Sequence, residues 1–274
     1  MRVLITNDDG ISSPGLSVLA NVAHEAGHEV IIAAPDKQYS GYSAALSAET
    51  TENSNQYPDS PGHPSIPTSE GRPPGAPEEV ESIAVHASPA LIAYAAGMGA
   101  FGPRPDLVLS GINLGANYGP AVVHSGTVGA AMSAAAQGIP ALAASISGFA
   151  PSHWETAYPV IREAFTWLTS HPQDGRILNV NIPDIPLAQL RGLRKADLAT
   201  FGTAPDMVDR SVRHILFGHL ASDPDQQPQF PAGTDVFELS QGWATVSLIR
   251  APNHDDHQAE LPVFDRELSA EETQ

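Results

Sequence analysis

The first 35 residues alternate between short apolar runs and a stretch with helical spacing. Residues 3–5 are a continuous apolar run that ends in polar residues, which is typical of a strand buried on both faces. From residue 16 to residue 23 the apolar positions follow the helical period, after Ser13 and Pro14, which suit a helix start. Gly27 is placed to end that helix, and residues 30–34 are a second apolar run. The order strand–helix–strand predicts the opening of a doubly wound α/β domain.

The same alternation continues to Pro183, which would stop the last strand of the series. Strands are expected at residues 83–85, 107–109, 141–146 and 177–182, and helices at 89–98, 128–138 and 154–168. Residues 49–79 interrupt the pattern with seven prolines, which predicts an irregular loop. We therefore expect a Rossmann-like α/β catalytic core with a mostly parallel sheet over residues 1–183.

After residue 183 the pattern weakens. Residues 212–217 and 244–249 are expected to be strands, residues 219–233 are a loop rich in Asp, Pro and Gln, and the tail from Asp265 is charged. This predicts that residues 184–274 form a smaller, β-containing C-terminal extension. We expect it to pack on the core or on a partner subunit.

The composition narrows the chemistry. The chain has 274 residues and no cysteine, which excludes disulfides, a thiolate nucleophile and any metal site with cysteine ligands. Acidic residues outnumber basic ones by 31 to 13, so the formal charge is -18. Proteins that bind the nucleic-acid backbone or anionic lipid need dense positive charge, so neither kind of partner is expected. Such an acidic surface is also compatible with a high-salt habitat.

The N-terminal segment and the apolar runs bear on location. The first ten residues include two aspartates, and their apolar run is too short for the hydrophobic region of a signal peptide. No apolar run reaches the roughly 18 residues that a membrane span needs. We therefore expect a cytoplasmic protein.

Polar residues follow several of the predicted strands. Asp8 and Asp9 come directly after the first strand, where adjacent carboxylates suit a hard divalent cation, although Asp-Asp-Gly is also good turn chemistry. Ser40 follows the second strand and could be a neutral metal ligand or part of a turn. Asn113 and Asn117 lie in the glycine-rich run SGINLGANYG after the 107–109 strand. Their amides could contact a metal or a phosphate oxygen, and the run could equally be a simple turn.

The start of the helix expected after residue 125 is a candidate anion site. Ser125, Gly126 and Thr127 would present free backbone N–H groups there, although Ser125 could be an ordinary helix cap. His124, just before it, could be a general acid, a substrate contact or a structural residue. A cation site and an anion site at one edge of a parallel sheet together favour metal-assisted phosphoryl chemistry.

Five runs of the chain resemble the motifs of the SurE family of metal-dependent 5′/3′-nucleotidases. They are residues 5–11 (ITNDDGI), 34–43 (APDKQYSGYS), 110–119 (SGINLGANYG), 124–131 (HSGTVGAA) and 178–183 (LNVNIP). Residues 233–247 are similar to the family's C-terminal strand region. The resemblance therefore covers most of the chain. Residues 87–91 and 198–202 depart from the family pattern.

The resemblance implies roles for individual residues. The ligands of one divalent metal ion, Mg²⁺ or Mn²⁺, would be Asp8, Asp9, Ser40 and Asn113. The phosphate would be bound by Asn117 and the Ser125-Gly126-Thr127 turn. It also implies a Rossmann-like core whose C-terminal segments are exchanged between the subunits of a homodimer or homotetramer.

The expected reaction is the hydrolysis of nucleoside 5′-monophosphates, and of 3′-monophosphates as a further substrate class. Asp8 or Asp9 would orient or deprotonate the attacking water. An aspartyl-phosphate mechanism needs a second carboxylate two positions after the first, and Asn7 and Gly10 occupy the positions that would satisfy that spacing. The alternative is a non-catalytic module that binds Mg²⁺ and a nucleotide.

Overall fold

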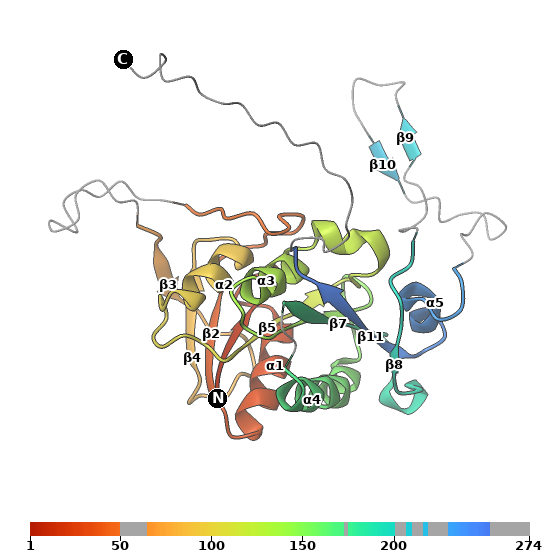
Figure 1. Cartoon of the computed structure of the whole chain (residues 1–274), viewed down its shortest axis with the longest axis horizontal. Helices are drawn as coiled ribbons and strands as arrows, with labels where there is room; N and C mark the ends of the chain where they lie inside the picture. The colour runs from red at the N-terminus through yellow and green to blue at the C-terminus, as the bar shows by residue number, and fades with distance from the viewer. Residues whose placement is uncertain (50–64, 173–174, 201–206, 210–215, 219–229, 253–274) are drawn as a thin grey trace, which may run out of the picture.

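Six parallel strands form the centre of the fold. The computed structural model describes residues 1–49, 65–172, 175–200, 207–209, 216–218 and 230–252. Its parallel strands are β1 (Arg2–Thr6), β2 (Glu29–Pro35), β4 (Glu81–Val85), β5 (Leu107–Leu114), β6 (Ala141–Ile146) and β7 (Arg176–Ile182). Their order in the sheet is β4-β2-β1-β5-β6-β7, so the chain winds outward from β1 in one direction and then in the other (Figure 1). This order confirms the Rossmann-like, doubly wound fold.

Three further strands complete a nine-stranded mixed sheet. β3 (Thr68–Glu70) pairs antiparallel with β4, β11 (Ala244–Arg250) pairs antiparallel with β7, and β8 (Leu193–Lys195) pairs parallel with β11. The strand expected at 244–249 is thus confirmed and joins the same sheet as the core. β9 (Met207–Asp209) and β10 (Leu216–Gly218) form a separate two-stranded sheet. Most of the strand expected at 212–217 and the tail from Asp265 lie outside the described residues.

Two sequence predictions need correction. The expectation of an irregular loop over residues 49–79 was wrong at β3, whose three residues are polar and exposed and pair with the neighbouring strand without any apolar alternation. The strand expected at 107–109 continues to Leu114, because a register shift between Ser110 and Asn113 lets the glycine-rich run stay in the sheet.

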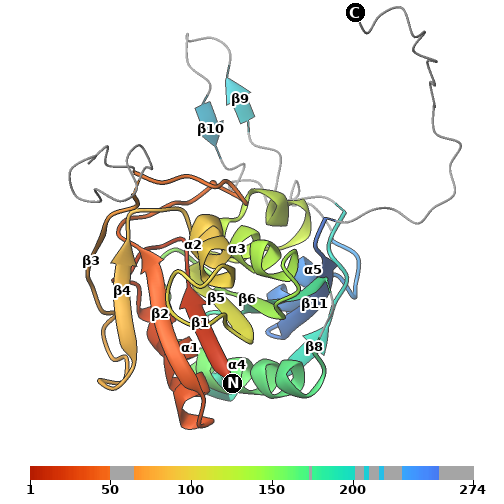
Figure 2. The ribbon, with the colours of Figure 1, turned by 60° about the vertical axis from the view of Figure 1, so that its left-hand side comes forward.

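Helices cover both faces of the sheet. α1 (Pro14–Glu25) and α4 (Trp154–Ser170) lie on one face, and α2 (Pro89–Gly97) and α3 (Gly126–Ala135) lie on the other (Figures 1 and 2). Because both faces are covered, the central strands are buried and carry the continuous apolar runs seen in the sequence. None of the helices in the described stretches is both long and apolar enough to cross a membrane.

Short elements complete the chain near the carboxyl ends of the strands. They are two 3₁₀ helices, η1 (Gly119–His124) and η2 (Leu187–Gln189), and the helix α5 (Asp235–Ser240). Asp235 is fully buried and accepts hydrogen bonds from the backbone N–H of Gly119 (2.8 Å) and of Ala199 (2.9 Å). One carboxyl group therefore fastens the start of η1, which follows β5, to the C-terminal part of the chain.

Candidate functional site

The turn after β1 is closed by an asparagine. The Asn7 side chain accepts a hydrogen bond from the Gly10 N–H and donates one to the Gly10 carbonyl, both at 3.1 Å. Gly10 has φ +98°, and a Cβ there would lie 3.3 Å from the backbone of Lys37, so the turn lies close against the chain that leaves β2. This fixed turn holds Asp8 and Asp9 at the carboxyl edge of the sheet.

The Asp8 carboxyl lies at the N-terminus of α3. It is 3% exposed, and the Thr127 hydroxyl donates a hydrogen bond to it. A Cβ on Gly126 would lie 2.8 Å from the Asp8 side chain, so only glycine leaves room for the carboxyl there. Burial raises the pKa of Asp8, while hydrogen bonds from Thr127 and the Gly126 backbone lower it. The predicted anion site at the start of α3 is therefore occupied by the carboxyl group of Asp8.

Asp9 shares this corner with Asp8. The Leu114 N–H donates a hydrogen bond of 3.0 Å to Asp9 Oδ2. Burial, and then the neighbouring Asp8 carboxyl, raise the pKa of Asp9 to about 6. In the part of the chain that the structure describes, no Lys, Arg or His forms an ion pair with either carboxyl. Two adjacent carboxylates without a cationic side chain are a favourable place for a metal ion.

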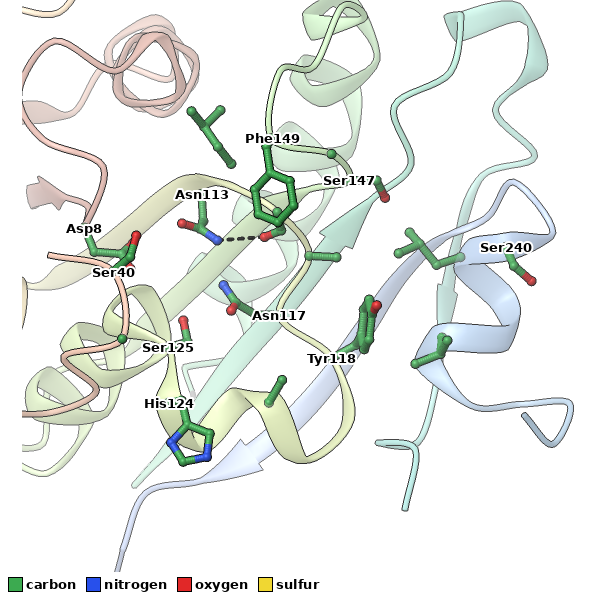
Figure 3. Close-up of a pocket in the computed structure, with 18 residues that line it drawn as sticks. Asp8, Ser40, Asn113, Asn117, Tyr118, His124, Ser125, Ser147, Phe149 and Ser240 are labelled. Carbon is green, nitrogen blue, oxygen red and sulfur yellow. Dashed lines mark hydrogen bonds between the residues drawn. The ribbon is translucent and has the colours of Figure 1, made fainter. Parts of the chain in front are cut away.

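Asn113 reaches the same corner from β5. Gly111 makes this possible, because a Cβ there would lie 2.3 Å from the Ala144 carbonyl on β6. The Asn113 amide nitrogen donates to the Gly115 carbonyl at 2.7 Å, which turns the amide oxygen toward Asp8 and Ser40 (Figure 3). The amide oxygen, rather than the amide nitrogen, is therefore the Asn113 atom that faces this corner.

Ser40 is brought in by a segment that folds over α3. The Tyr39 N–H donates to the Asp8 carbonyl at 2.7 Å, and the Ser43 hydroxyl donates to the Val123 carbonyl at 2.6 Å. A Cβ on Gly129 would lie only 2.2 Å from the Ser43 carbonyl oxygen, so the glycine in α3 lets the segment lie against the helix. Ser40 itself is exposed, and its hydroxyl accepts a hydrogen bond of 3.0 Å from Gln38.

These groups open onto a cavity of about 640 Å³ at the carboxyl edge of the sheet (Figure 3). The predicted residues that line it are Asp8, Ser40, Asn113, Asn117, His124 and Ser125. Asp9, Gly126 and Thr127 do not line it: Asp9 contacts Leu114, and the other two lie against Asp8. The structure thus brings the four candidate metal ligands to one corner, with Asp8 facing the cavity.

Asn117 is held rigidly in the cavity wall. Its N–H donates to the Asn181 side chain at 2.8 Å, and its side-chain amide donates to the Ser145 hydroxyl at 2.8 Å. Its carbonyl accepts hydrogen bonds from the side chains of Asn179 (2.9 Å) and Asn181 (3.0 Å). The two asparagines of the LNVNIP run therefore position Asn117, which explains why a buried strand carries amide side chains.

Sequence reasoning missed a second group of lining residues. Ser147 and Phe149 follow β6, and Tyr118 precedes η1. Val236, Leu239 and Ser240 come from α5. The rule that ligands bind beyond the carboxyl ends of parallel strands could have indicated Phe149. No pattern in the sequence indicated α5, because its six residues are too few for a helical period.

Residues 87–91, which depart from the family pattern, do not line the cavity. The Ser88 hydroxyl donates to the Ala45 carbonyl at 2.5 Å, and its oxygen accepts a hydrogen bond from the Ser47 N–H at 3.1 Å. The segment thus supports the chain that runs from Ser40 over α3.

Comparison with known proteins identifies the same family that the sequence motifs indicate. The profile of the family described as "Survival protein SurE" matches residues 3–203. The chain belongs to the SurE family. It is 33% identical over 270 residues to a protein of Klebsiella pneumoniae (strain 342) named "5′/3′-nucleotidase SurE", covering 97% of this chain and 96% of that protein. It is 39% identical over 248 residues to the protein of the same name from Cronobacter sakazakii (strain ATCC BAA-894), covering 90% and 89%.

A solved structure supports the fold. The crystal structure of the SurE protein from Aquifex aeolicus matches with a TM-score of 0.67 over 93% of this chain and 95% of that chain, at 22% identity. The recognition of the SurE family from its sequence motifs is therefore confirmed, together with the α/β fold.

Proposed function

We propose that this chain is a metal-dependent phosphomonoesterase that hydrolyses nucleoside 5′- or 3′-monophosphates to a nucleoside and phosphate. The observation that carries the proposal is the corner where Asp8, Asp9, Ser40 and Asn113 meet beside a cavity large enough for a nucleotide. The relatives named 5′/3′-nucleotidase, which match nearly the full chain, support the substrate class and the hydrolytic reaction.

The donor set suits one hard divalent cation, Mg²⁺ or Mn²⁺. It offers two carboxylates, one hydroxyl and one amide oxygen. The described residues contain no group of three or more His, Cys, Asp or Glu side chains that could hold a metal ion. Oxygen donors such as those of this corner suit hard cations rather than soft ones. Mg²⁺ is commonly held by one or two carboxylates with its remaining positions open to water and phosphate. When bound, the cation would offset the charge on the phosphate and make water more acidic.

The residues around the corner have separate tasks. Ser125 Oγ accepts the Val128 N–H at 3.1 Å, which leaves the hydroxyl proton free for a phosphate oxygen. Asn117 presents a side chain whose position is fixed by β6 and β7. Thr127 and Gly126 act through Asp8, because they hold its carboxyl at the start of α3. Asp8 or Asp9 orients the water.

We also propose a homodimer or homotetramer with a cytoplasmic location, in which the C-terminal extension lies between subunits. An apolar groove of about 410 Å³ between α4, β8 and β11 supports this assembly, since Trp167 and Leu248 line it and are 42% and 48% exposed. Light scattering of the purified protein tests it, and a monomer at all concentrations would contradict it.

The function is tested by phosphate release from a panel of monophosphates. Metal-free protein is assayed with no metal, with Mg²⁺ and with Mn²⁺. Each assay is run with and without about 2 M salt, because the acidic surface is compatible with a high-salt habitat. We expect release only with metal and a preference for nucleoside monophosphates. A folded protein that binds nucleotide and metal without releasing phosphate would instead be a non-catalytic binding module.

A further inference from the structure

Phe149 is exposed in an unusual place. Its side chain is 83% exposed, the highest value among the exposed large apolar residues that the structure describes. Single exposed apolar side chains are common on protein surfaces and need no explanation by themselves. Phe149, however, lines the same cavity as Asp8, Asn113 and Ser125 (Figure 3). An aromatic ring left open to solvent inside a binding cavity is available to contact a ligand.

The loop that carries Phe149 is anchored on both sides. Before it, the Ser147 N–H donates to the Ile182 carbonyl at 2.8 Å, at the end of β7. After it, the Asp184 carboxylate accepts hydrogen bonds from the N–H groups of Ser152 and His153, at 2.8 to 3.1 Å. The backbone of the loop that carries the ring is therefore held at both ends.

The ring lies a short distance from the metal corner. A Cβ on Gly115 would lie 3.4 Å from Phe149 Cε1 and 3.9 Å from the amide nitrogen of Asn113. The Phe149 ring and the Asn113 amide nitrogen therefore both lie close to the space that a side chain at Gly115 would fill. A phosphate held at Asp8 and Asn113 would leave the rest of its ester beside the ring.

The remainder of the cavity wall lacks cationic side chains. Neither a Lys nor an Arg is among the described residues that line it, whereas Tyr118, Val236 and Leu239 add aromatic and apolar surface. A flat, uncharged group fits this wall better than a second phosphate would, because a second phosphate would have no lysine or arginine to pair with and His124 is the one basic residue among the described lining residues.

We propose that Phe149 is the stacking platform for the base of the nucleoside monophosphate and so determines specificity for esters that carry a base. This inference rests on the proposed function. Stacking on an aromatic ring accepts every base, because each base has a π-face. Phe149 therefore separates nucleotides from sugar phosphates and discriminates weakly among the bases.

The test compares adenosine 5′-monophosphate with ribose 5-phosphate, which lacks the base. Stacking on an aromatic side chain contributes about 1–3 kcal/mol per base, which corresponds to about 5- to 150-fold. We expect Phe149→Ala to lower kcat/KM for adenosine 5′-monophosphate by this factor, mainly through KM, and to leave ribose 5-phosphate unchanged. Phe149→Trp should restore the preference. Tyr94→Ala, which removes an exposed aromatic on α2 outside the cavity, should change neither substrate.

Two results would overturn the proposal. One is an equal loss for both substrates in Phe149→Ala, which would indicate a structural or catalytic role. The other is a wild-type enzyme that does not prefer the ester with a base. If the wild type releases no phosphate at all, the proposed function fails by itself. Calorimetric binding of adenosine 5′-monophosphate in the presence of Mg²⁺ then decides the role of Phe149, because Phe149→Ala must weaken that binding by the same factor.

Discussion

At the scale of single residues, the centre of the site is a pair of carboxyl groups, Asp8 and Asp9, that repel each other when both are ionised and no cation is bound. Asp8 and Asp9 are adjacent in the chain, both have a raised pKa, and no cationic side chain in the described part of the molecule is paired with either. Hydrogen bonds from Thr127 and Leu114 orient the two carboxyls without neutralising them. The arrangement is therefore poorly suited to stability alone and well suited to binding a cation.

Replacing Asp9 by Asn should remove most of the phosphatase activity. The variant keeps the size of the side chain and an oxygen for the Leu114 N–H, but it loses one of the two negative charges. We expect kcat/KM to fall by about 100-fold or more, as when one preorganised electrostatic group is lost. Phosphate release measures the activity, and circular dichroism checks the fold. Glu70→Gln, on exposed β3, is the control. Near-normal turnover of Asp9→Asn would remove Asp9 from the site.

The raised pKa of Asp9 also predicts how the metal-free protein responds to pH. The pKa is about 6 in the folded protein, whereas the ordinary value for an aspartate is 3.8, so the folded state binds this proton more tightly than the unfolded chain does. The stabilisation from this proton is fully present below about pH 4 and is lost as the pH rises through about 6. The difference amounts to at most about 3 kcal/mol.

Chemical denaturation of metal-free wild type and Asp9→Asn, over a pH range from about 4.5 to about 7.5 that brackets this pKa, measures the effect. The wild type should lose stability relative to the variant as the pH rises. Parallel profiles for the two proteins would show that Asp9 titrates as an ordinary surface carboxyl.

At the scale of elements, close backbone approaches set the positions of the candidate metal ligands. Gly111 lets β5 lie against the Ala144 carbonyl of β6, and Gly129 lets the Ser40–Ser43 segment lie against α3. Asp235 adds the C-terminal wall by fastening α5 to the start of η1. The glycines of the sequence motifs therefore act mainly by allowing segments to pack closely. This packing positions the polar residues that lie between the glycines.

Gly129→Ala should damage the site through this packing. The new Cβ would lie 2.2 Å from the Ser43 carbonyl oxygen, so the segment that carries Ser40 has to move. Overpacking of this kind costs about 1–3 kcal/mol, so we expect a lower Tm together with weaker metal binding. Ser133→Ala is the matched control on α3, because the Ser133 hydroxyl donates within its own helix, to the Gly129 carbonyl. Unchanged metal affinity with a lowered Tm would separate Ser40 from the metal site.

The elements also show what a single sequence can predict. Buried parallel strands carry continuous apolar runs, so β1, β2 and β6 were predictable, and so were the polar residues that follow β1 and β2. β7 was expected as well, although Asn179 and Asn181 interrupt its apolar run. β3 was not, because an exposed three-residue edge strand depends on its partner rather than on its own pattern. The apolar wall from α5 was also unpredictable, since it depends on a tertiary contact through Asp235.

At the scale of the whole molecule, the formal charge of -18 destabilises the compact folded state and opposes the binding of a negatively charged substrate. The negative charge raises the local concentration of cations near the acidic corner, and it disfavours a substrate dianion unless a cation is present. Metal binding and general salt screening should therefore both stabilise the protein, but through different groups.

Thermal unfolding can separate these two effects. Raising NaCl from about 0.05 M to about 0.5 M should increase the Tm of metal-free wild type and Asp9→Asn alike, because screening acts on all the surface charges. Adding Mn²⁺ at constant ionic strength should stabilise the wild type further, by about 2.7 kcal/mol at a free concentration about 100 times the Kd, and should stabilise Asp9→Asn much less. Ca²⁺ at the same concentration controls for the ionic charge of the cation. An equal response of both proteins to Mn²⁺ would mean that the cation acts by screening, and the carboxyl pair would then not be its binding site.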